Sequence, residues 1–180
     1  MHSPLIATAR KTHMTHNNNE FKITRTFDVP RELMWKAWTE SKMFGQWFGP
    51  TGFKSMVKTM DLKPGGILHS CLKSPDGAEM WAKFVYREVT PPLRLVWEHS
   101  FSNKDAGITR HPGHESWPLK MVTTVVFDDI GNKTKITLTW VTLEASESEQ
   151  KTFNESMDGM TQGWTGTFNQ LDDFFKMTPF

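Results

Sequence analysis

The chain has almost none of the residues that disulfide frameworks and thiol-based motifs require. Cys71 is the only cysteine among 180 residues, which excludes an internal disulfide and any CxxC zinc or redox motif. No histidine adjoins this cysteine in the sequence, so the thiol is expected to pack as a small apolar side chain. The lack of disulfides predicts a protein of the reducing cytoplasm.

Long apolar runs and runs of like charge are missing as well. No apolar stretch reaches the length of about 18 residues that suggests a transmembrane helix, so no membrane insertion is expected. The formal net charge is +1 at pH 7 and lysines and arginines do not cluster, which disfavours nucleic acid and anionic membranes as partners. Residues 1–19 are polar and lack a signal-peptide core. We expect them to form a flexible tail before a single domain over residues 20–178.

Motifs for common catalytic and metal chemistry are absent too. The sequence has no GxSxG, no carboxylate pair at a catalytic spacing and no phosphate-binding glycine loop. His111, His114 and Glu115 in "HPGHE" do not match the helical HExxH spacing, and no fourth ligand is evident. The sequence therefore predicts neither a metal ion nor a cofactor, and it favours a protein that is not an enzyme.

The N-terminal part of the domain shows a strand followed by two short helices. Residues 21–27 alternate apolar and polar side chains, as a strand with one buried face does. Asp28 is the expected N-cap and Pro30 the first-turn residue of a helix. Thr39 is expected to cap a second short helix, which ends at Gly49.

The middle of the chain, from residue 52 to residue 143, has the pattern of six strands and no helix. Turn sequences such as "KPGG", "SPDG" and "DDIGN" separate successive strands. The stretch 102–118 is expected to form a long loop.

The C-terminal segment, residues 147–176, has large apolar side chains at steps of three and four. This spacing predicts a single long amphipathic helix. Gly159, Gly163 and Gly166 lie within it and should each cost about 1 kcal/mol relative to alanine. Such a cost suggests either close packing or room left for another group.

Together these elements predict an α+β helix-grip fold. A curved antiparallel sheet of about seven strands would wrap around the long C-terminal helix, and the two short helices after the first strand would close one end.

Seven segments of the chain, in this order and at these spacings, resemble the family of homologues of the activator of the 90-kDa heat-shock chaperone's ATPase. That family belongs to the START-like (SRPBCC, birch-pollen-allergen-like) superfamily, and the resemblance points to its CalC-like branch. It spans residues 21–176 and implies an apolar cavity between the sheet and the long helix. The segments are "FDVPRELMWKAWTESKMFGQWFGPTGF", "DLKPGG", "SPDG", "YREVTPPLRLVWEHSF", "TRHPGHESWPLKMVTTVVF", "GNKTKITLTW" and "QGWTGTFNQLDDFF".

Strand alternation, helical spacing and the resemblance together give a set of expected cavity residues. The alternative is that these side chains simply fill a core. Two histidines of the set are candidate polar groups in the pocket, or they are merely hydrogen-bonded at its rim. Phe84 stands where many relatives carry a small residue, so an inward ring would make the cavity smaller. The expected set is Trp38, Trp47, His69, Trp81, Phe84, Trp97, His99, Phe101, Met121, Met157, Met160, Trp164 and Phe168.

Three functions follow from the resemblance. The first is binding of a hydrophobic or aromatic small molecule, such as a lipid or a polyketide-like compound, since CalC-like relatives accept an enediyne antibiotic. The second is a co-chaperone-like interaction protein acting on the 90-kDa heat-shock chaperone in a stress response. The third is a pocket enzyme of cyclase or hydrolase type that uses His69, His99 or Arg25. A monomer and a homodimer both remain open: an exposed Trp117 would suggest a dimer contact, and a buried one would close the pocket mouth.

Overall fold

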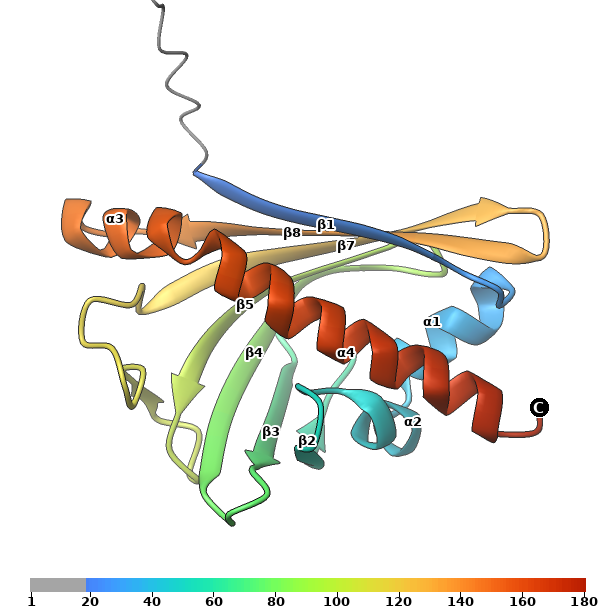
Figure 1. The fold of residues 1–180 in the computed structure, drawn as a ribbon, viewed down its shortest axis with the longest axis horizontal. Helices are drawn as coiled ribbons and strands as arrows, with labels where there is room; N and C mark the ends of the chain where they lie inside the picture. Colours follow the sequence, from blue (N-terminus) through green and yellow to red (C-terminus); the bar gives the residue numbers. More distant parts are fainter. Residues whose placement is uncertain (1–18) are drawn as a thin grey trace, which may run out of the picture.

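A computed structural model describes residues 19–180 as one curved antiparallel sheet with a long helix across its concave face (Figure 1). The elements, in chain order, are β1 (Glu20–Phe27), α1 (Arg31–Thr39), α2 (Ser41–Trp47), β2 (Lys54–Met60), β3 (Ile67–Lys73), β4 (Glu79–Thr90), β5 (Arg94–Ser102), β6 (Ile108–Thr109), β7 (Lys120–Ile130), β8 (Lys133–Leu143), α3 (Glu147–Glu155) and α4 (Met157–Met177).

The strand order across the sheet is β1-β8-β7-β5-β4-β3-β2, with the short β6 attached to β5. Every pairing is antiparallel. The β4–β5 register shifts between Tyr86 and Glu88, and an irregularity of this kind bends a strand and increases its twist. The sheet curves around α4, while α1 and α2 are drawn on either side of the C-terminal half of that helix (Figure 1). The predicted α+β helix-grip arrangement is confirmed.

The starts of the two short helices differ from the prediction. Pro30, with φ −61° and ψ 146°, is the N-cap of α1, so Asp28 does not cap this helix. Thr39 lies in the last turn of α1, where its hydroxyl donates to the Trp35 carbonyl at 2.7 Å. Glu40 is therefore the N-cap of α2. A threonine hydroxyl bonded to the carbonyl four residues earlier is a common competitor of capping.

The predicted single C-terminal helix is two helices. The break falls at Ser156, whose φ of −97° and ψ of 8° are not helical. The Ser156 hydroxyl donates to the Thr152 carbonyl at 2.7 Å. The apolar spacing continues across the break, which is why periodicity alone predicted one helix. In Figure 1, α3 lies beyond the end of β8 and α4 crosses the concave face.

The middle of the chain has seven strands where six were predicted. The additional one is the two-residue β6, which lies inside the expected long loop and pairs with the end of β5. A lone bridge between His111 and His114 gives the same loop further internal order.

Aromatic rings from α1, α2, the sheet and α4 form the centre of the core. The Trp38 ring lies 4.8 Å from the Trp47 ring and stacks on Trp164 at 6.4 Å with an interplanar angle of 11°. Fully burying a large apolar side chain contributes about 1.5–3 kcal/mol. The packing of these rings thus holds the short helices against α4, and the rings fill one end of the space between the sheet and α4.

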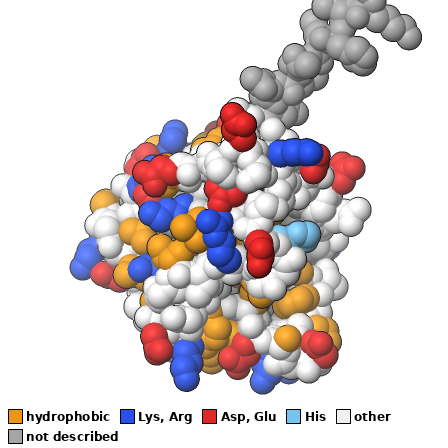
Figure 2. Space-filling model, turned by 90° about the vertical axis from the view of Figure 1, so that its left-hand side faces the viewer, with side chains coloured by type: hydrophobic (Ala, Val, Ile, Leu, Met, Phe, Trp, Pro, Cys, Tyr) orange, Lys and Arg blue, Asp and Glu red, His pale blue; other side chains and the backbone are white. Residues whose placement is uncertain are grey.

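The surface and the helices give two further facts about the described residues. On the face drawn in Figure 2, basic and acidic side chains are interspersed and no field of one sign forms. Within residues 19–180, no helix combines the length and apolarity needed to cross a lipid bilayer.

Candidate ligand-binding site

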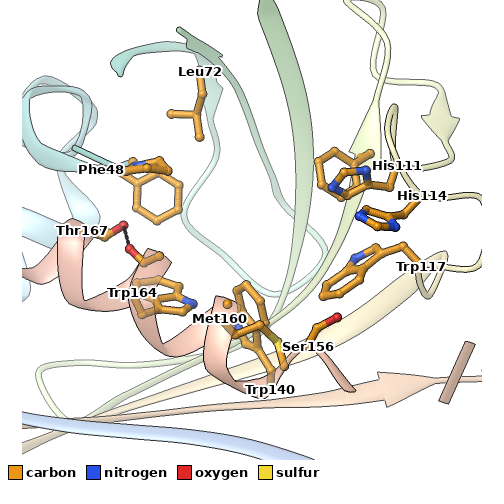
Figure 3. A pocket seen from close by; sticks show the side chains of 15 residues that line it. Phe48, Leu72, His111, His114, Trp117, Trp140, Ser156, Met160, Trp164 and Thr167 are labelled. Carbon is orange, nitrogen blue, oxygen red and sulfur yellow. Dashed lines mark hydrogen bonds between the residues drawn. The ribbon is translucent and has the colours of Figure 1, made fainter. Parts of the chain in front are cut away.

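A cavity of about 390 Å³ lies between the first turns of α4, the end of α2 and the loop that joins β5 to β7 (Figure 3). This volume is within the range of about 300–1,000 Å³ that is usual for small-molecule sites. None of the described lining residues is Asp, Glu, Lys or Arg. The lining consists of Phe48, Gly49, Pro50, Leu72, Phe101, His111, His114, Trp117, Trp140, Ser156, Gly159, Met160, Gly163, Trp164 and Thr167.

Two glycines form the helical floor of this cavity. Gly159 and Gly163 are one turn apart on α4, and a Cβ atom built on either would meet no atom within 4 Å. Gly166 differs, because a Cβ there would lie 3.1 Å from the Thr51 hydroxyl. Close packing therefore applies to Gly166, whereas Gly159 and Gly163 leave room for another group.

An aromatic partition separates the cavity from a smaller void of about 30 Å³. Phe48, Trp140 and Trp164 border both spaces. Phe84 points to the concave side, where it lies edge-on to Phe48 at 5.9 Å and borders the small void. Its ring occupies space that a small residue would leave open, so it limits the size of the small void.

His99 is the polar group at the small void. Its Nδ1 lies 2.9 Å from the Thr123 hydroxyl, and its ring lies 4.8 Å from Trp140. Burial lowers the pKa of His99 to about 3 because the apolar surroundings disfavour the imidazolium. His99 is thus neutral at physiological pH and can form hydrogen bonds but carries no charge.

The β5–β7 loop forms the outer wall of the cavity. Trp117 is half-buried, its ring lies 6.3 Å from Phe153, and it lines the cavity. The His111 Nδ1 accepts a hydrogen bond from the Gly113 amide at 2.9 Å. Burial and the neighbouring His114 lower the pKa of His111, which keeps this ring neutral at pH 7.

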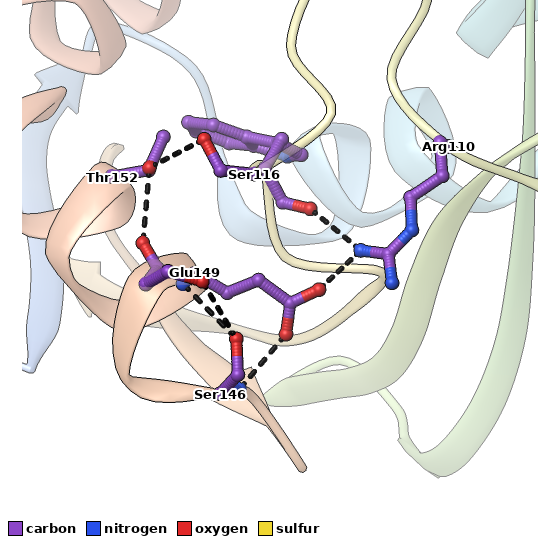
Figure 4. A network of polar contacts seen from close by, with 7 residues as sticks. Arg110, Ser116, Ser146, Glu149 and Thr152 are labelled. Atoms are coloured by element: carbon purple, nitrogen blue, oxygen red, sulfur yellow. Dashed lines mark hydrogen bonds and ion pairs between the residues drawn. The ribbon is translucent and has the colours of Figure 1, made fainter.

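Polar contacts hold this loop against α3 (Figure 4). Arg110 forms an ion pair with Glu149 and also donates to the Trp117 carbonyl at 3.3 Å. The Thr152 hydroxyl donates to the Ser116 hydroxyl at 2.9 Å. Because Glu149 accepts from Arg110 and from a backbone amide, the pKa of its carboxyl lies below the usual range.

Glu149 also completes the N-terminal cap of α3. Its carboxylate accepts from the Ser146 amide at 2.9 Å, and the Ser146 hydroxyl accepts from the Glu149 amide at 3.3 Å. This reciprocal capping box places the carboxylate where it can reach the loop.

The structure brings six of the thirteen expected residues to the two spaces. Phe101, Met160 and Trp164 line the cavity. Phe84, Trp97, His99 and again Trp164 line the small void. Four others lie in the core away from both spaces, namely Trp38, Trp47, Met121 and Phe168. Met157 is half-buried and packs against this core.

His69 and Trp81 are on the opposite, convex face of the sheet. Leu68 pairs with the inward-facing Phe84. His69 is one residue from Leu68 and Trp81 is three residues from Phe84, so both side chains point to the other face of the sheet. There the His69 ring packs 4.9 Å from Trp81, and its Nε2 lies 3.1 Å from the Asn103 carbonyl. The two side chains form a small polar and aromatic cluster outside the cavity.

Several lining residues were not in the expected set. Trp140 could have been found, because it continues the inward alternation of Ile136 and Leu138 along β8. The one-turn spacing of Gly159 and Gly163 was a second signal. The contribution of the β5–β7 loop had no periodic signal, since it depends on how the loop folds back. Within residues 19–180, no group of three or more His, Cys, Asp or Glu side chains is arranged to hold a metal ion.

Solved structures with the same fold share little sequence with this chain. A protein from Arthrobacter aurescens, solved by NMR, has a TM-score of 0.75 and 20% identity, covering 88% of this chain and 87% of its own. Protein Ms6760 from Mycobacterium smegmatis has a TM-score of 0.72 and 20% identity, covering 91% and 94%. CalU16 from Micromonospora echinospora has a TM-score of 0.54 and 19% identity, covering 86% and 74%. At these identities the likeness shows the fold alone. No match is found among curated proteins.

The family comparison covers nearly all of the described domain. The model of the family described as "Activator of Hsp90 ATPase homolog 1-like protein" matches residues 28–176. This range begins after β1 and includes both short helices, the remaining strands and all but the end of α4. The chain belongs to the family of Activator of Hsp90 ATPase homolog 1-like proteins.

Proposed function

We propose that this protein binds a hydrophobic or aromatic small molecule in the cavity between the sheet and α4. The observation that carries the proposal is the 390 Å³ space walled by aromatic side chains and floored by two glycines. Glycine in a helix interior costs stability, and here that cost leaves apolar space beside the helix backbone. Apolar walls with a few polar groups are typical of small-molecule sites.

The absence of charged lining side chains limits the chemical classes of ligand that the cavity can bind. An ionised group buried without a partner is strongly disfavoured, so a carboxylate or phosphate head would have to remain outside the mouth. An uncharged molecule, or the apolar part of a lipid, fits the lining.

The test is native mass spectrometry of the protein as purified from cells, followed by denaturing extraction of any bound molecule. The matched variant is Gly163→Leu, which should fill the cavity from its floor, because a Cβ at this position meets no atom within 4 Å. We expect the wild-type protein to carry an apolar molecule and the folded variant to have lost it. An equal load on both proteins would show that the molecule is bound elsewhere.

A co-chaperone role acting on the 90-kDa heat-shock chaperone is the alternative, and its support is the family description. It predicts that a folded Gly163→Leu protein still associates with the chaperone, because the contact would be at the surface. A pulldown with purified chaperone, run beside the mass measurement, separates the two functions.

A further inference from the structure

The Trp164 side chain is buried, but its indole nitrogen is not covered by protein atoms and has no hydrogen-bond acceptor among the described residues. Its side chain is only 6% exposed, and no acceptor for its Nε1–H is found among residues 19–180. In contrast, the nearby Trp47 Nε1–H donates to the Ala37 carbonyl at 3.0 Å. Most polar groups of buried side chains have a hydrogen-bond partner, so an open indole donor at the cavity is available to a ligand.

The surroundings fix the direction of this donor. Trp164 is stacked on Trp38 and lies edge-on to both Phe48 and Trp140, so its ring has little freedom to turn toward another acceptor. Figure 3 shows the nitrogen edge of Trp164 turned toward the space between α4 and the loop that carries Trp117. Trp117 and Trp140 also have unpartnered Nε1–H groups, but protein atoms cover both nitrogens.

The shape of the lining favours a flat molecule. Gly159 and Gly163 present bare helix backbone over one turn, a rise of about 6 Å, so a ring system can lie directly against α4. The walls next to this floor are rings, among them Phe48 and Trp117. Aromatic rings pack well against flat faces and edges of other rings.

The hydroxyl groups of the lining are already engaged as donors. Thr167 donates to the Gly163 carbonyl at 3.0 Å and Ser156 donates to the Thr152 carbonyl at 2.7 Å. Within the described lining, the indole of Trp164 is thus the best-buried donor whose nitrogen is both unpartnered and uncovered.

We infer that the cavity takes a planar, uncharged, polycyclic molecule with a carbonyl-type oxygen, and that the Trp164 Nε1–H donates a hydrogen bond to that oxygen. This inference rests on the proposed function and makes it more specific. The ring system lies on the glycine floor, and the oxygen points toward the aromatic partition.

Three probes separate the parts of this inference. 9-Fluorenone has three fused coplanar rings and one carbonyl, fluorene has the same rings without the carbonyl, and benzophenone has the carbonyl on two twisted rings. We expect 9-fluorenone to bind at least about fivefold tighter than fluorene, the size of effect that one neutral hydrogen bond gives. It should also bind tighter than benzophenone, because the floor favours a flat molecule.

The variant Trp164→Phe removes the donor and keeps an aromatic ring. Affinities are measured by titration followed by tryptophan fluorescence and by ¹H–¹⁵N NMR, where the eight tryptophans give separate indole signals and the variant assigns that of Trp164. We expect the preference for 9-fluorenone over fluorene to vanish in the variant. In the wild-type protein, the Trp164 indole proton should move downfield with 9-fluorenone and not with fluorene. This second measurement needs only a correct assignment, so it holds even if the variant is destabilised.

Each of the other outcomes contradicts one part of this inference or all of it. Equal affinity for 9-fluorenone and fluorene, or a preference that persists in Trp164→Phe, removes the hydrogen bond but leaves the proposed function intact. Benzophenone binding as tightly as 9-fluorenone removes the planar requirement. Binding of none of the probes overturns the whole inference, while the mass measurement on protein purified from cells decides the proposed function independently.

Discussion

The rings of Phe84 and Trp97 lie on the paired strands β4 and β5, with centroids 5.7 Å apart and planes inclined by only 21°. Both rings border the 30 Å³ void beside His99. Phe84 therefore sets how far empty space extends into the sheet side of the core.

Truncating Phe84 should create a new apolar binding space. We expect Phe84→Ala to lower the free energy of unfolding by about 3–5 kcal/mol, as is usual for loss of a buried phenylalanine. The vacated volume is close to that of benzene, and dry apolar cavities of this kind bind it. Urea unfolding with and without benzene measures both effects. Phe84→Leu is the control, and it should lose less stability and gain no benzene site.

His99 should make stability depend on pH. Its pKa is near 3 in the folded protein against an ordinary value of 6.5, so below pH 6.5 the unfolded chain binds one more proton than the folded one. Stability is then fully present above pH 6.5 and falls by about 1.4 kcal/mol per pH unit as the pH drops toward 3. We expect His99→Gln to flatten this part of the profile. The same dependence of the free energy of unfolding on pH in the wild-type protein and in His99→Gln, measured between pH 6 and pH 4, would contradict a neutral His99 in the folded protein.

The Arg110–Glu149 ion pair should hold the β5–β7 loop closed over the cavity. Glu149→Gln removes the charge but preserves the capping box, which accepts either residue. Arg110 is 51% exposed, so we expect a loss of less than about 1 kcal/mol, together with faster hydrogen–deuterium exchange in residues 103–119. The control is Glu155→Gln, which breaks the exposed Lys151–Glu155 pair on the same helix and should leave the loop unchanged.

The same ion pair should make the stability of the β5–β7 loop depend on pH. Glu149 has a pKa below its ordinary value of 4.5, so the stabilisation is present above that value and is lost as the pH falls through the lower folded pKa. Exchange in residues 103–119 of the wild-type protein should approach that of Glu149→Gln in this acidic window. Equal exchange in the wild-type protein and Glu149→Gln above pH 4.5 would show that the pair does not hold the loop.

A substitution at Gly163 should raise the stability of the protein and weaken its binding of a ligand. Gly163→Ala should raise the free energy of unfolding by up to about 1 kcal/mol, because the added Cβ meets no atom within 4 Å. The same methyl group enters the cavity and should weaken binding of 9-fluorenone. Thr165→Ala on the exposed side of α4 is the control, expected to stabilise without affecting binding. Unchanged binding to Gly163→Ala would place the ligand away from this floor.

The sequence predicted the architecture because its signals are local and periodic. Alternation along the strands, turn sequences and the apolar spacing in residues 147–176 each follow from neighbouring residues. The Ser156 break escaped prediction because a single residue with non-helical φ and ψ leaves the spacing of buried side chains unchanged. Helix starts at Pro30 and Glu40 were misplaced by one or two residues, because neither helix begins with the side-chain cap that the prediction relied on.

The cavity was harder to predict because it depends on which face of each strand points inward. The expected set included both Trp81 and Phe84, which are three residues apart and so point to opposite faces of β4. Register with neighbouring strands decides between such residues, and single-strand alternation does not reveal it. His111, His114 and Trp117 reach the cavity through the fold of an irregular loop, for which the sequence has no period.

The sheet order has a consequence for how the chain acquires its structure. Phe27 pairs with Thr134 and Glu20 with Val141, so β1 is made before the other strands of this sheet but its partner β8 is made after all of them. Pairings between such distant segments require the closure of long loops and form slowly. Until then Phe21 and Phe27, both fully buried in the finished protein, are exposed on a nascent segment. We expect docking of β1 to be a late step of folding, and the stage at which a chaperone would protect the chain.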